Sequence, residues 1–191
     1  MPGRWTVDSR VFQENAQNLV QEADCFAVVK NNAYNFGLDF AVAQFLQIGI
    51  QHFVTTSLNE AIAVRKRAPQ ATILLTNPTR EFDLVKKYHI HLTLTSLDYF
   101  YAYQDQLEDL PLQIEYESQL HRSGLKSREE IDQVLAHRDQ LDIQGIWTHF
   151  GYADDLDGPG DEYSKEREDW LDLLEGLQED CLLYTSPSPR D

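Results

Sequence analysis

Apolar segments rich in β-branched residues alternate with helical patterns along this chain, at a repeat of about twenty residues. Strands that alternate with helices of this length are typical of βαβ units, in which crossover helices join parallel strands. The sequence therefore predicts an α/β fold built on a parallel sheet. The predicted strands are residues 26–30, 52–56, 72–76, 91–95, 112–117 and 143–150, and the predicted helices are residues 39–48, 57–67, 80–88, 96–106, 127–138 and 162–179. Ser57 with Glu60, and Ser127 with Glu130, fit a capping box at two of the helix starts.

Two architectures are compatible with six such strands, an open doubly wound sheet and a (β/α)8 TIM barrel. A dinucleotide-binding open sheet needs a glycine-rich loop after its first strand, and the sequence has none at that point. A complete barrel has eight β/α units and roughly 250 residues, whereas this chain has 191. We therefore expect a TIM barrel truncated after about six strands and occupying residues 1–180.

The last part of the chain, residues 181–191, differs in character from the acidic helical pattern before it. Two Ser-Pro pairs interrupt the helix, and the string LLYTSPSPRD resembles the translation of a sequencing adapter. A disordered native tail would have a similar composition. We expect residues 181–191 to be a non-native tail that packs loosely or not at all, and we exclude Cys181 from any chemistry.

Charge and cysteine content narrow the class of partner. The net charge is −16, and residues 153–180 hold twelve Asp or Glu against Lys165 and Arg167. Nucleic acid and anionic membranes need clustered Lys and Arg, so we expect neither as a partner. The acidic run could hold a metal or a basic partner, but a solvated helix face is the favoured interpretation. Because the sequence shows no membrane span, no signal peptide and only two cysteines, we expect a cytoplasmic location.

The first candidate site follows the first predicted strand. The segment FAVVK places Lys30 at the carboxyl end of a buried strand, where the side chains of a barrel meet the substrate. A partly desolvated lysine there can have a lowered pKa and form a Schiff base with an aldehyde cofactor. Tyr34 follows within reach of an anionic group, and Gly37 would let the backbone turn into the next helix. Spacing alone leaves two alternatives open, a solvated lysine and a tyrosine that only packs.

Two further strand ends carry polar residues. After the fifth strand, EYESQLHRSGL places Glu115 on the inward face and Arg122 in the next loop, where an arginine can bind a carboxylate or phenolate oxygen. Glu115 could orient Arg122 by ion pairing, and an ordinary loop salt bridge fits the pattern equally well. The sixth strand ends in IWTHFG, where His149 can carry a proton or support an aromatic cofactor. A rim histidine bonded to backbone is the alternative, and the spacing gives no support for a zinc site.

Together these three strand ends resemble the alanine racemase family. AVVKNNAYNFG resembles its cofactor-lysine motif, usually AVVKANAYGHG. EYESQLHRSGL occupies the place of its K-x-D-T-G-M-x-R-x-G segment, and GIWTHFGYADD that of its G-x-x-T-H-F-A-x-A-D segment. Order and spacing agree across residues 1–180. The lysine motif is highly specific, and the threefold match is more so.

The resemblance implies a barrel followed by a β-rich domain, working as a homodimer with pyridoxal 5′-phosphate and without a metal. Lys30 then matches the lysine that holds the cofactor and acts as one of two catalytic bases. Tyr34 matches the tyrosine that binds the cofactor phosphate. Arg122 matches the arginine that binds the cofactor's phenolic oxygen and lies near the substrate carboxylate, and His149 matches the histidine behind the pyridine ring. The second base of the family is a tyrosine from the partner subunit's C-terminal domain.

Three of the chain's departures from the family pattern bear on the predicted site. Asn35 and Phe36 replace the usual Gly-His, and Asn tolerates a left-handed turn better than most residues. Residues 117–120 are Glu-Ser-Gln-Leu in place of Asp-Thr-Gly-Met, which leaves the substrate selectivity open. Glu115 stands where many members have a lysine that becomes carbamylated. A glutamate could supply the same negative charge to Arg122 without modification.

The expected function is the racemisation of L-alanine and D-alanine, which supplies D-alanine for cell-wall peptidoglycan, and we expect the truncated chain not to be competent alone. The alternatives are a non-catalytic pyridoxal-phosphate-binding homeostasis barrel, a serine or broad-specificity racemase, and a basic amino-acid decarboxylase. Decarboxylases of this kind usually read YAVKAN without the continuation that Ala33, Tyr34 and Gly37 provide here. This continuation favours the racemase.

Overall fold

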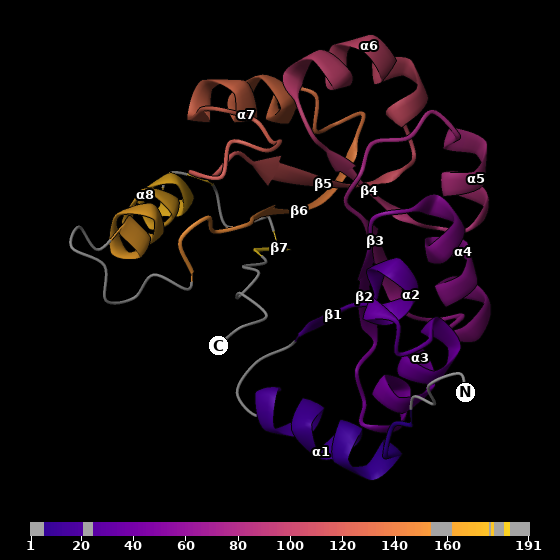
Figure 1. Ribbon diagram of the computed structural model, residues 1–191. Coiled ribbons are helices and arrows are strands. Elements are labelled where there is room, and N and C mark those ends of the chain that lie inside the picture. Colours follow the sequence, from indigo (N-terminus) through magenta and orange to yellow (C-terminus); the bar gives the residue numbers. More distant parts are fainter. Residues whose placement is uncertain (1–5, 21–24, 154–161, 176, 178–181, 184–191) are drawn as a thin grey trace. The chain divides into compact units, whose positions relative to one another are not determined.

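The computed structural model describes residues 6–20, 25–153, 162–175, 177 and 182–183. The chain forms two compact units, Met1–Thr76 and Asn77–Asp191. Along the described residues, six strands from β1 to β6 alternate with helices (Figure 1). Each strand lies within the range that the sequence predicts or within two residues of it, which confirms the α/β class. None of the helices in the described ranges combines the length and the apolar character that a bilayer span requires.

The first unit contains three parallel strands and four helices among its described residues. Residue pairing joins β1 to β2, with Ala27 opposite Phe53, and joins β2 to β3, with Phe53 opposite Ile73. Phe53 and Ile73 are fully buried. The elements are α1 (Ser9–Leu19), β1 (Phe26–Val28), α2 (Lys30–Tyr34), α3 (Leu38–Gln47), β2 (His52–Thr55), α4 (Leu58–Arg67) and β3 (Thr72–Leu75).

Helix α1 is not among the helices predicted from the sequence. Its first turn is capped by Asp8, whose carboxylate accepts hydrogen bonds from the N–H groups of Arg10 and Val11. The ring of Phe12 lies 5.2–5.5 Å from the rings of three aromatic residues of the same unit, namely Phe36, Phe40 and Phe45. Aromatic pairs at such distances stabilise a contact beyond their buried area. The helix therefore depends on partners distant in sequence, which local patterns do not reveal.

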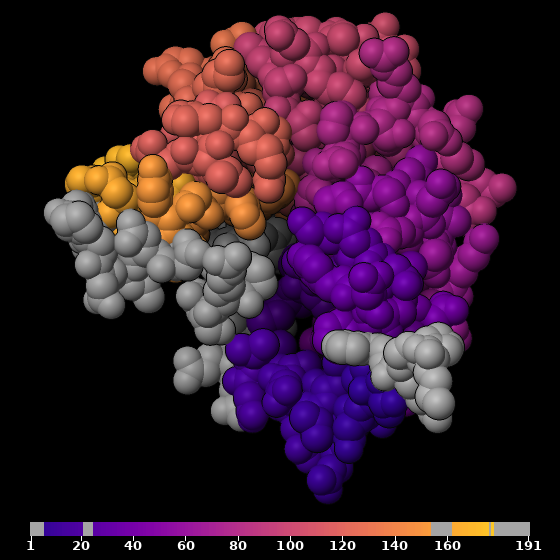
Figure 2. All heavy atoms as spheres, viewed as in Figure 1, coloured from indigo at the N-terminus to yellow at the C-terminus, as the bar shows by residue number. Residues whose placement is uncertain are grey.

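The second unit continues the same strand–helix repeat. Parallel pairing joins β4 to β5 and β5 to β6. Helices α6 and α7 lie side by side and form a contiguous surface (Figure 2), where the Tyr101 hydroxyl donates to Gln133 Oε1 at 3.0 Å and Gln104 Nε2 lies 3.0 Å from His137 Nδ1. The elements are α5 (Phe82–Lys87), β4 (His91–Leu94), α6 (Leu97–Leu107), β5 (Pro111–Tyr116), α7 (Arg128–Leu135), β6 (Asp142–Thr148), α8 (Glu162–Glu175) and β7 (Leu182–Leu183).

Strand β5 has one face turned toward the helices and one polar face. Tyr116 stacks on Trp170 of α8, with ring centroids 6.1 Å apart. Because successive side chains of a strand point to opposite faces, Glu115 lies on the face turned away from this contact. Gln113 shares that face with Glu115, and both are buried. The buried polar face is where the sequence analysis placed Glu115.

The end of the chain differs from the expectation in one respect. Leu182 and Leu183 form β7, which pairs in parallel with Gly145 and Ile146 of β6. The prediction that residues 181–191 pack loosely or not at all is wrong for these two residues. Without β7, the outer side of β6 would present unpaired N–H and C=O groups, which an added strand can pair with. The other residues of the expected tail lie outside the described residues.

Candidate functional site

Lys30 begins a short helical turn, α2, whose backbone is left-handed. Every residue from 31 to 35 has a positive φ, between 51° and 69°. A left-handed helical conformation costs roughly 1–2 kcal/mol for each L-residue with a side chain, and Asn accepts it more readily than Ala or Tyr. The expectation for Asn35 is confirmed, because its φ is 69°. A run of such residues persists only where the surrounding contacts determine it.

Hydrogen bonds from outside the turn hold it in place. The backbone N–H of Asn32 donates to Glu60 Oε1 at 2.7 Å, and the N–H of Leu38 donates to Asn32 Oδ1 at 2.7 Å. Glu60 Oε2 also accepts from the hydroxyl of Ser57 at 3.0 Å. Gly37, with φ of 97°, then leads the chain into α3, as the sequence analysis expects. The capping pair of α4 thus fixes the backbone next to Lys30.

The side chains of Lys30 and Tyr34 lie close together. Lys30 Nζ is 5.9 Å from the centroid of the Tyr34 ring, a distance at which an ammonium is attracted to an aromatic face. Tyr34 is 52% exposed, and Lys30 is partly exposed. Both polar groups can therefore meet a ligand without a rearrangement of the core.

Glu115 and Arg122 form the contact that the sequence predicts. Arg122 Nη2 donates to Glu115 Oε1 at 3.1 Å, and the hydroxyl of Ser123 donates to Glu115 Oε2 at 2.8 Å. The Glu115 side chain is 3% exposed, whereas that of Arg122 is 48% exposed. Arg122 therefore has its guanidinium anchored on a buried acid while part of it stays accessible.

Burial governs the protonation of Glu115. Removal from solvent raises the pKa of its carboxyl, and the hydrogen bonds from Ser123 and Arg122 oppose this shift without cancelling it. The Glu115 carboxylate therefore takes up a proton at a higher pH than an exposed glutamate does. The attraction between Arg122 and Glu115 is opposed by the free energy needed to remove the carboxylate from water, as in other buried ion pairs.

The loop that carries Arg122 is closed by backbone hydrogen bonds. The N–H of Gly124 donates to Thr95 O at 2.8 Å, that of Leu125 to Glu115 O at 2.7 Å, and that of Glu117 to Leu125 O at 2.9 Å. Gly124 has φ of 120°, and a Cβ at this position would lie 2.4 Å from Glu117 N. Only glycine allows this approach, so the loop has a fixed base from which Arg122 extends.

His149 follows β6 directly and is partly buried. The hydroxyl of the preceding residue, Thr148, donates to Tyr116 O at 3.0 Å and joins the ends of β5 and β6. The structure thus groups the predicted residues in two places. Lys30 and Tyr34 lie in the first unit, whereas Glu115, Arg122 and His149 lie at strand ends of the second.

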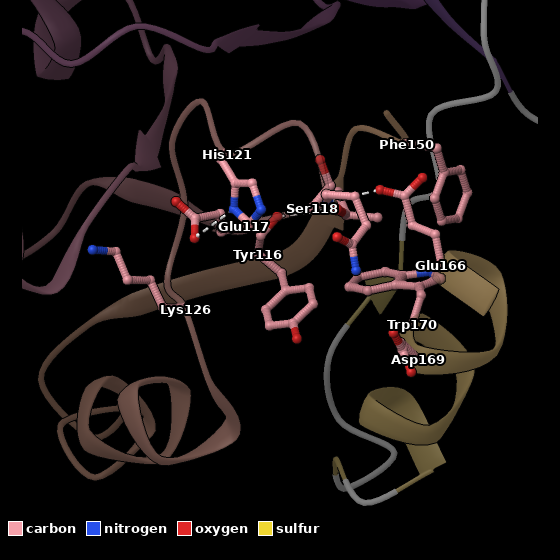
Figure 3. A pocket seen from close by; sticks show the side chains of 11 residues that line it. Tyr116, Glu117, Ser118, His121, Lys126, Phe150, Glu166, Asp169 and Trp170 are labelled. Carbon is pink, nitrogen blue, oxygen red and sulfur yellow. Dashed lines mark hydrogen bonds and ion pairs between the residues drawn. The ribbon is translucent and has the colours of Figure 1, made fainter. Parts of the chain in front are cut away.

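A pocket of about 160 Å³ lies between the end of β5 and α8 (Figure 3). None of the five predicted site residues lines it. Tyr116 faces the pocket, so Glu115 faces the opposite side of the strand. Its lining is Tyr116, Glu117, Ser118, Gln119, His121, Lys126, Thr148, Phe150, Glu166, Asp169 and Trp170. Within the described residues, no group of three or more His, Cys, Asp or Glu side chains is placed to hold a metal ion.

Glu166 lines this pocket and was not among the residues predicted from the sequence. The acidic run is interpreted from the sequence as a solvated helix face, yet Glu166 is only 5% exposed. Its spacing from Trp170 and Leu173, four and seven residues later, marks a buried helical stripe. Both of those residues are buried as well. That periodicity is the sequence pattern from which the burial of Glu166 could have been predicted.

The chain is similar in sequence and in fold to proteins named alanine racemase. Alanine racemase 2 of Staphylococcus aureus strain Mu50 is 46% identical over 182 residues, which are 93% of this chain and 50% of that protein. The crystal structure of alanine racemase from E. faecalis matches with a TM-score of 0.85 at 25% identity, over 94% of this chain and 52% of that one. Alanine racemase from Bartonella henselae, solved with covalently bound pyridoxal phosphate, matches with a TM-score of 0.81 at 22% identity, over 94% of this chain and 55% of that one.

These matches define the extent of the similarity. The chain spans about half the length of the curated relatives it matches. The structural matches confirm the fold as that of the first six β/α units of a TIM barrel. A sequence model described as the alanine racemase N-terminal domain matches residues 7–187. Because that match covers far more than half of this chain, the chain belongs to the alanine racemase N-terminal domain family.

Proposed function

We propose that this chain supplies the cofactor lysine of an alanine racemase, an enzyme that interconverts L-alanine and D-alanine with pyridoxal 5′-phosphate. The observation that carries the proposal is the position of Lys30 two residues after the end of β1, at the start of a left-handed turn held by Glu60. The 46% identity to a protein named alanine racemase 2 supports the choice of reaction.

The residues present fit this cofactor in their chemistry. A cofactor with an aldehyde needs a primary amine, which Lys30 offers in a partly exposed position. Its phosphate needs hydrogen-bond donors, of which the exposed Tyr34 hydroxyl is one. Its phenolic oxygen needs a cationic donor, and Arg122 presents a guanidinium that Glu115 holds in place.

Each residue then has a defined task. Pyridoxal phosphate, when bound, supplies an aldehyde carbon for attachment and a ring that accepts electron density from the substrate Cα. Lys30 Nζ would hold the cofactor at rest and carry the Cα proton on one face of the substrate. Arg122 would bind the phenolic oxygen and face the substrate carboxylate, and Tyr34 would donate to the phosphate. His149 would lie behind the ring as a hydrogen-bonding support.

Glu115 would take the place of the carbamylated lysine found in many members of the family. Its carboxylate already accepts a hydrogen bond from Arg122 at 3.1 Å, so the arginine has its anionic partner without chemical modification. Because burial raises the pKa of this carboxyl, the orientation of Arg122 would depend on pH. A carbamate and a buried glutamate would thus differ in how readily they lose their charge.

The wider setting follows from the same proposal. Racemisation needs a base on each face of the substrate, and Lys30 serves one face. We propose that the second base comes from a partner subunit in a homodimer, so that turnover belongs to the full-length enzyme. The substrate is alanine, the location is the cytoplasm, and the product D-alanine supplies peptidoglycan synthesis.

Covalent labelling tests the site. The chain is incubated with pyridoxal 5′-phosphate, reduced with borohydride and digested, and the modified peptide is identified by mass spectrometry. We expect the label on Lys30, and its loss in Lys30→Ala, because the turn presents this amine at the strand end. Lys66→Ala is the matched control, since Lys66 is an exposed lysine of the same unit. A label that stays on another lysine in the Lys30 variant would refute the assignment.

Labelling does not separate a racemase from a carrier that only stores the cofactor. Racemisation of L-alanine by the full-length enzyme does, because a carrier has no second base. We expect circular dichroism of an L-alanine solution to decay with the full-length enzyme and to stay constant with its Lys30→Ala variant. A full-length protein that takes the label and leaves L-alanine unchanged would favour the carrier.

A further inference from the structure

We propose that Glu166 of α8 is a positioning residue that sets the spacing between the loop carrying Arg122 and the strand end carrying His149. The inference rests on the proposed function, because Arg122 and His149 are the residues through which the second unit would contact the cofactor. Figure 3 shows Glu166 extending from α8 toward the loop that follows β5.

The Glu166 carboxylate accepts hydrogen bonds from the backbone of both segments. Oε1 accepts from the N–H of Gln119 at 2.9 Å and of Gly151 at 3.0 Å. Oε2 accepts from the N–H of Gly151 at 2.8 Å and of Tyr152 at 3.2 Å. Gln119 lies three residues before Arg122, and Gly151 lies two residues after His149. One side chain therefore joins the bases of both predicted cofactor contacts.

The two segments approach each other closely where Glu166 binds them. A Cβ on Gly151 would lie 3.0 Å from Leu120 N, so the glycine leaves no space between the two backbones. Glu166 itself is on a helix that packs against β5, since Trp170 stacks on Tyr116. The carboxylate is thus held against the strand on one side and binds the two segments on the other.

A carboxylate suits this position better than an amide would. An ionised carboxylate only accepts hydrogen bonds, and bonds from N–H groups to it are about twice as strong as neutral ones. A glutamine would turn an NH2 group toward at least one of the backbone N–H groups. Two donors facing each other in a buried site leave one of them unsatisfied. Glu166→Gln therefore keeps the shape of the side chain but disrupts its hydrogen bonds to the two segments.

The experiment compares the 191-residue chain with Glu166→Gln and with Glu168→Gln, which removes the same charge from an exposed position of the same helix. Amide hydrogen exchange of Gln119, Gly151 and Tyr152 is measured by NMR. A spectral titration with pyridoxal 5′-phosphate gives the affinity and the pH midpoint of the bound cofactor's absorbance change. We expect Glu166→Gln to speed the three exchange rates and to weaken cofactor binding, each by about tenfold, and to shift the midpoint. Glu168→Gln should change none of these.

A second variant keeps the test valid if Glu166→Gln unfolds. Gly151→Ala places a Cβ 3.0 Å from Leu120 N and leaves the Glu166 side chain in place, so the two segments must shift slightly and we expect weaker cofactor binding. Unchanged exchange rates in Glu166→Gln would overturn the inference. Faster exchange with unaltered cofactor affinity and absorbance would also overturn it, because Glu166 would then have a purely structural role. A native chain that gives no cofactor absorbance would instead contradict the proposed function, and the exchange rates would still show whether Glu166 holds the two segments.

Discussion

Arg122 is a partly exposed arginine whose ion-pair partner, Glu115, is buried. The Arg122 side chain is 48% exposed and that of Glu115 is 3% exposed. An exposed pair contributes little to stability, but loss of a partner from a buried acid leaves an uncompensated group in the core. Glu115 therefore anchors the guanidinium of Arg122, and the pair is weak evidence for added stability.

The raised pKa of Glu115 gives this residue a defined pH dependence. The folded chain keeps the Glu115 proton at pH values where the unfolded chain has lost it, so stability falls as pH rises through that window. The contribution is fully present below the ordinary glutamate pKa and is lost above the raised one. We expect Glu115→Gln to remove this component of the decline, as measured by urea midpoints over a pH series. The exposed Glu108→Gln is the control, and parallel pH profiles for the native chain and Glu115→Gln would contradict the expectation.

Gly124 allows a separate test of the loop that carries Arg122. A Cβ at Gly124 would meet Glu117 N at 2.4 Å, whereas a Cβ at Gly49, which also has a positive φ, meets nothing within 4 Å. Gly49→Ala thus measures the cost of the left-handed backbone alone, about 1–2 kcal/mol. We expect Gly124→Ala to lower the free energy of unfolding clearly more, as measured by urea denaturation. Equal losses for the two variants would show that the loop can relax.

At the scale of elements, the N-terminus of α4 serves two purposes. Ser57 caps the helix by accepting from the N–H of Glu60, and Glu60 in turn binds the N–H of Asn32 in the left-handed turn. An ordinary capping box satisfies only its own helix. Here the same pair also stabilises the strained segment that presents Lys30, so the start of one helix is coupled to the conformation of another element.

This coupling predicts the effect of substitutions at Glu60. Glu60→Ala leaves the N–H of Asn32 without its acceptor, and we expect a loss of about 1–3 kcal/mol in the free energy of unfolding. Glu60→Gln keeps an acceptor oxygen and should lose less. Ser57→Ala isolates the cap, with a loss of about 1 kcal/mol. Urea denaturation of the three variants distinguishes these contributions, and a Glu60→Ala variant no less stable than Ser57→Ala would argue against the link to the turn.

For the whole molecule, the main electrostatic feature is the net charge of −16. Like charges repel in the compact state, and added salt screens exposed charges separated by more than about 10 Å at 0.1 M ionic strength. The ion pairs within the described residues, apart from that of Glu115, are mostly between exposed side chains and add little. We expect the urea midpoint to rise from low to high sodium chloride, and equally with potassium chloride. A midpoint that falls with salt would show that attractive pairs dominate.

Local patterns in the sequence are enough to locate the strands, most of the helices and the candidate site residues. Hydrophobic alternation and capping pairs such as Ser57 with Glu60 are local signals, so they specify elements without knowledge of the tertiary contacts. The same holds for Lys30, because a lysine that ends an apolar strand is legible in five consecutive letters. The preference of Asn35 for a left-handed conformation is equally local, and its φ of 69° agrees with it.

The contacts that hold these residues in place arise from the tertiary structure. Helix α1 forms against aromatic rings distant in sequence, the turn after Lys30 is fixed by Glu60, and β7 pairs with β6. Glu166 belongs to an acidic run whose composition suggests solvent, yet its burial follows from two loops that bring their N–H groups to it. Hydrogen bonds and desolvation depend on which groups meet in space, and a linear pattern of residue types does not contain those distances.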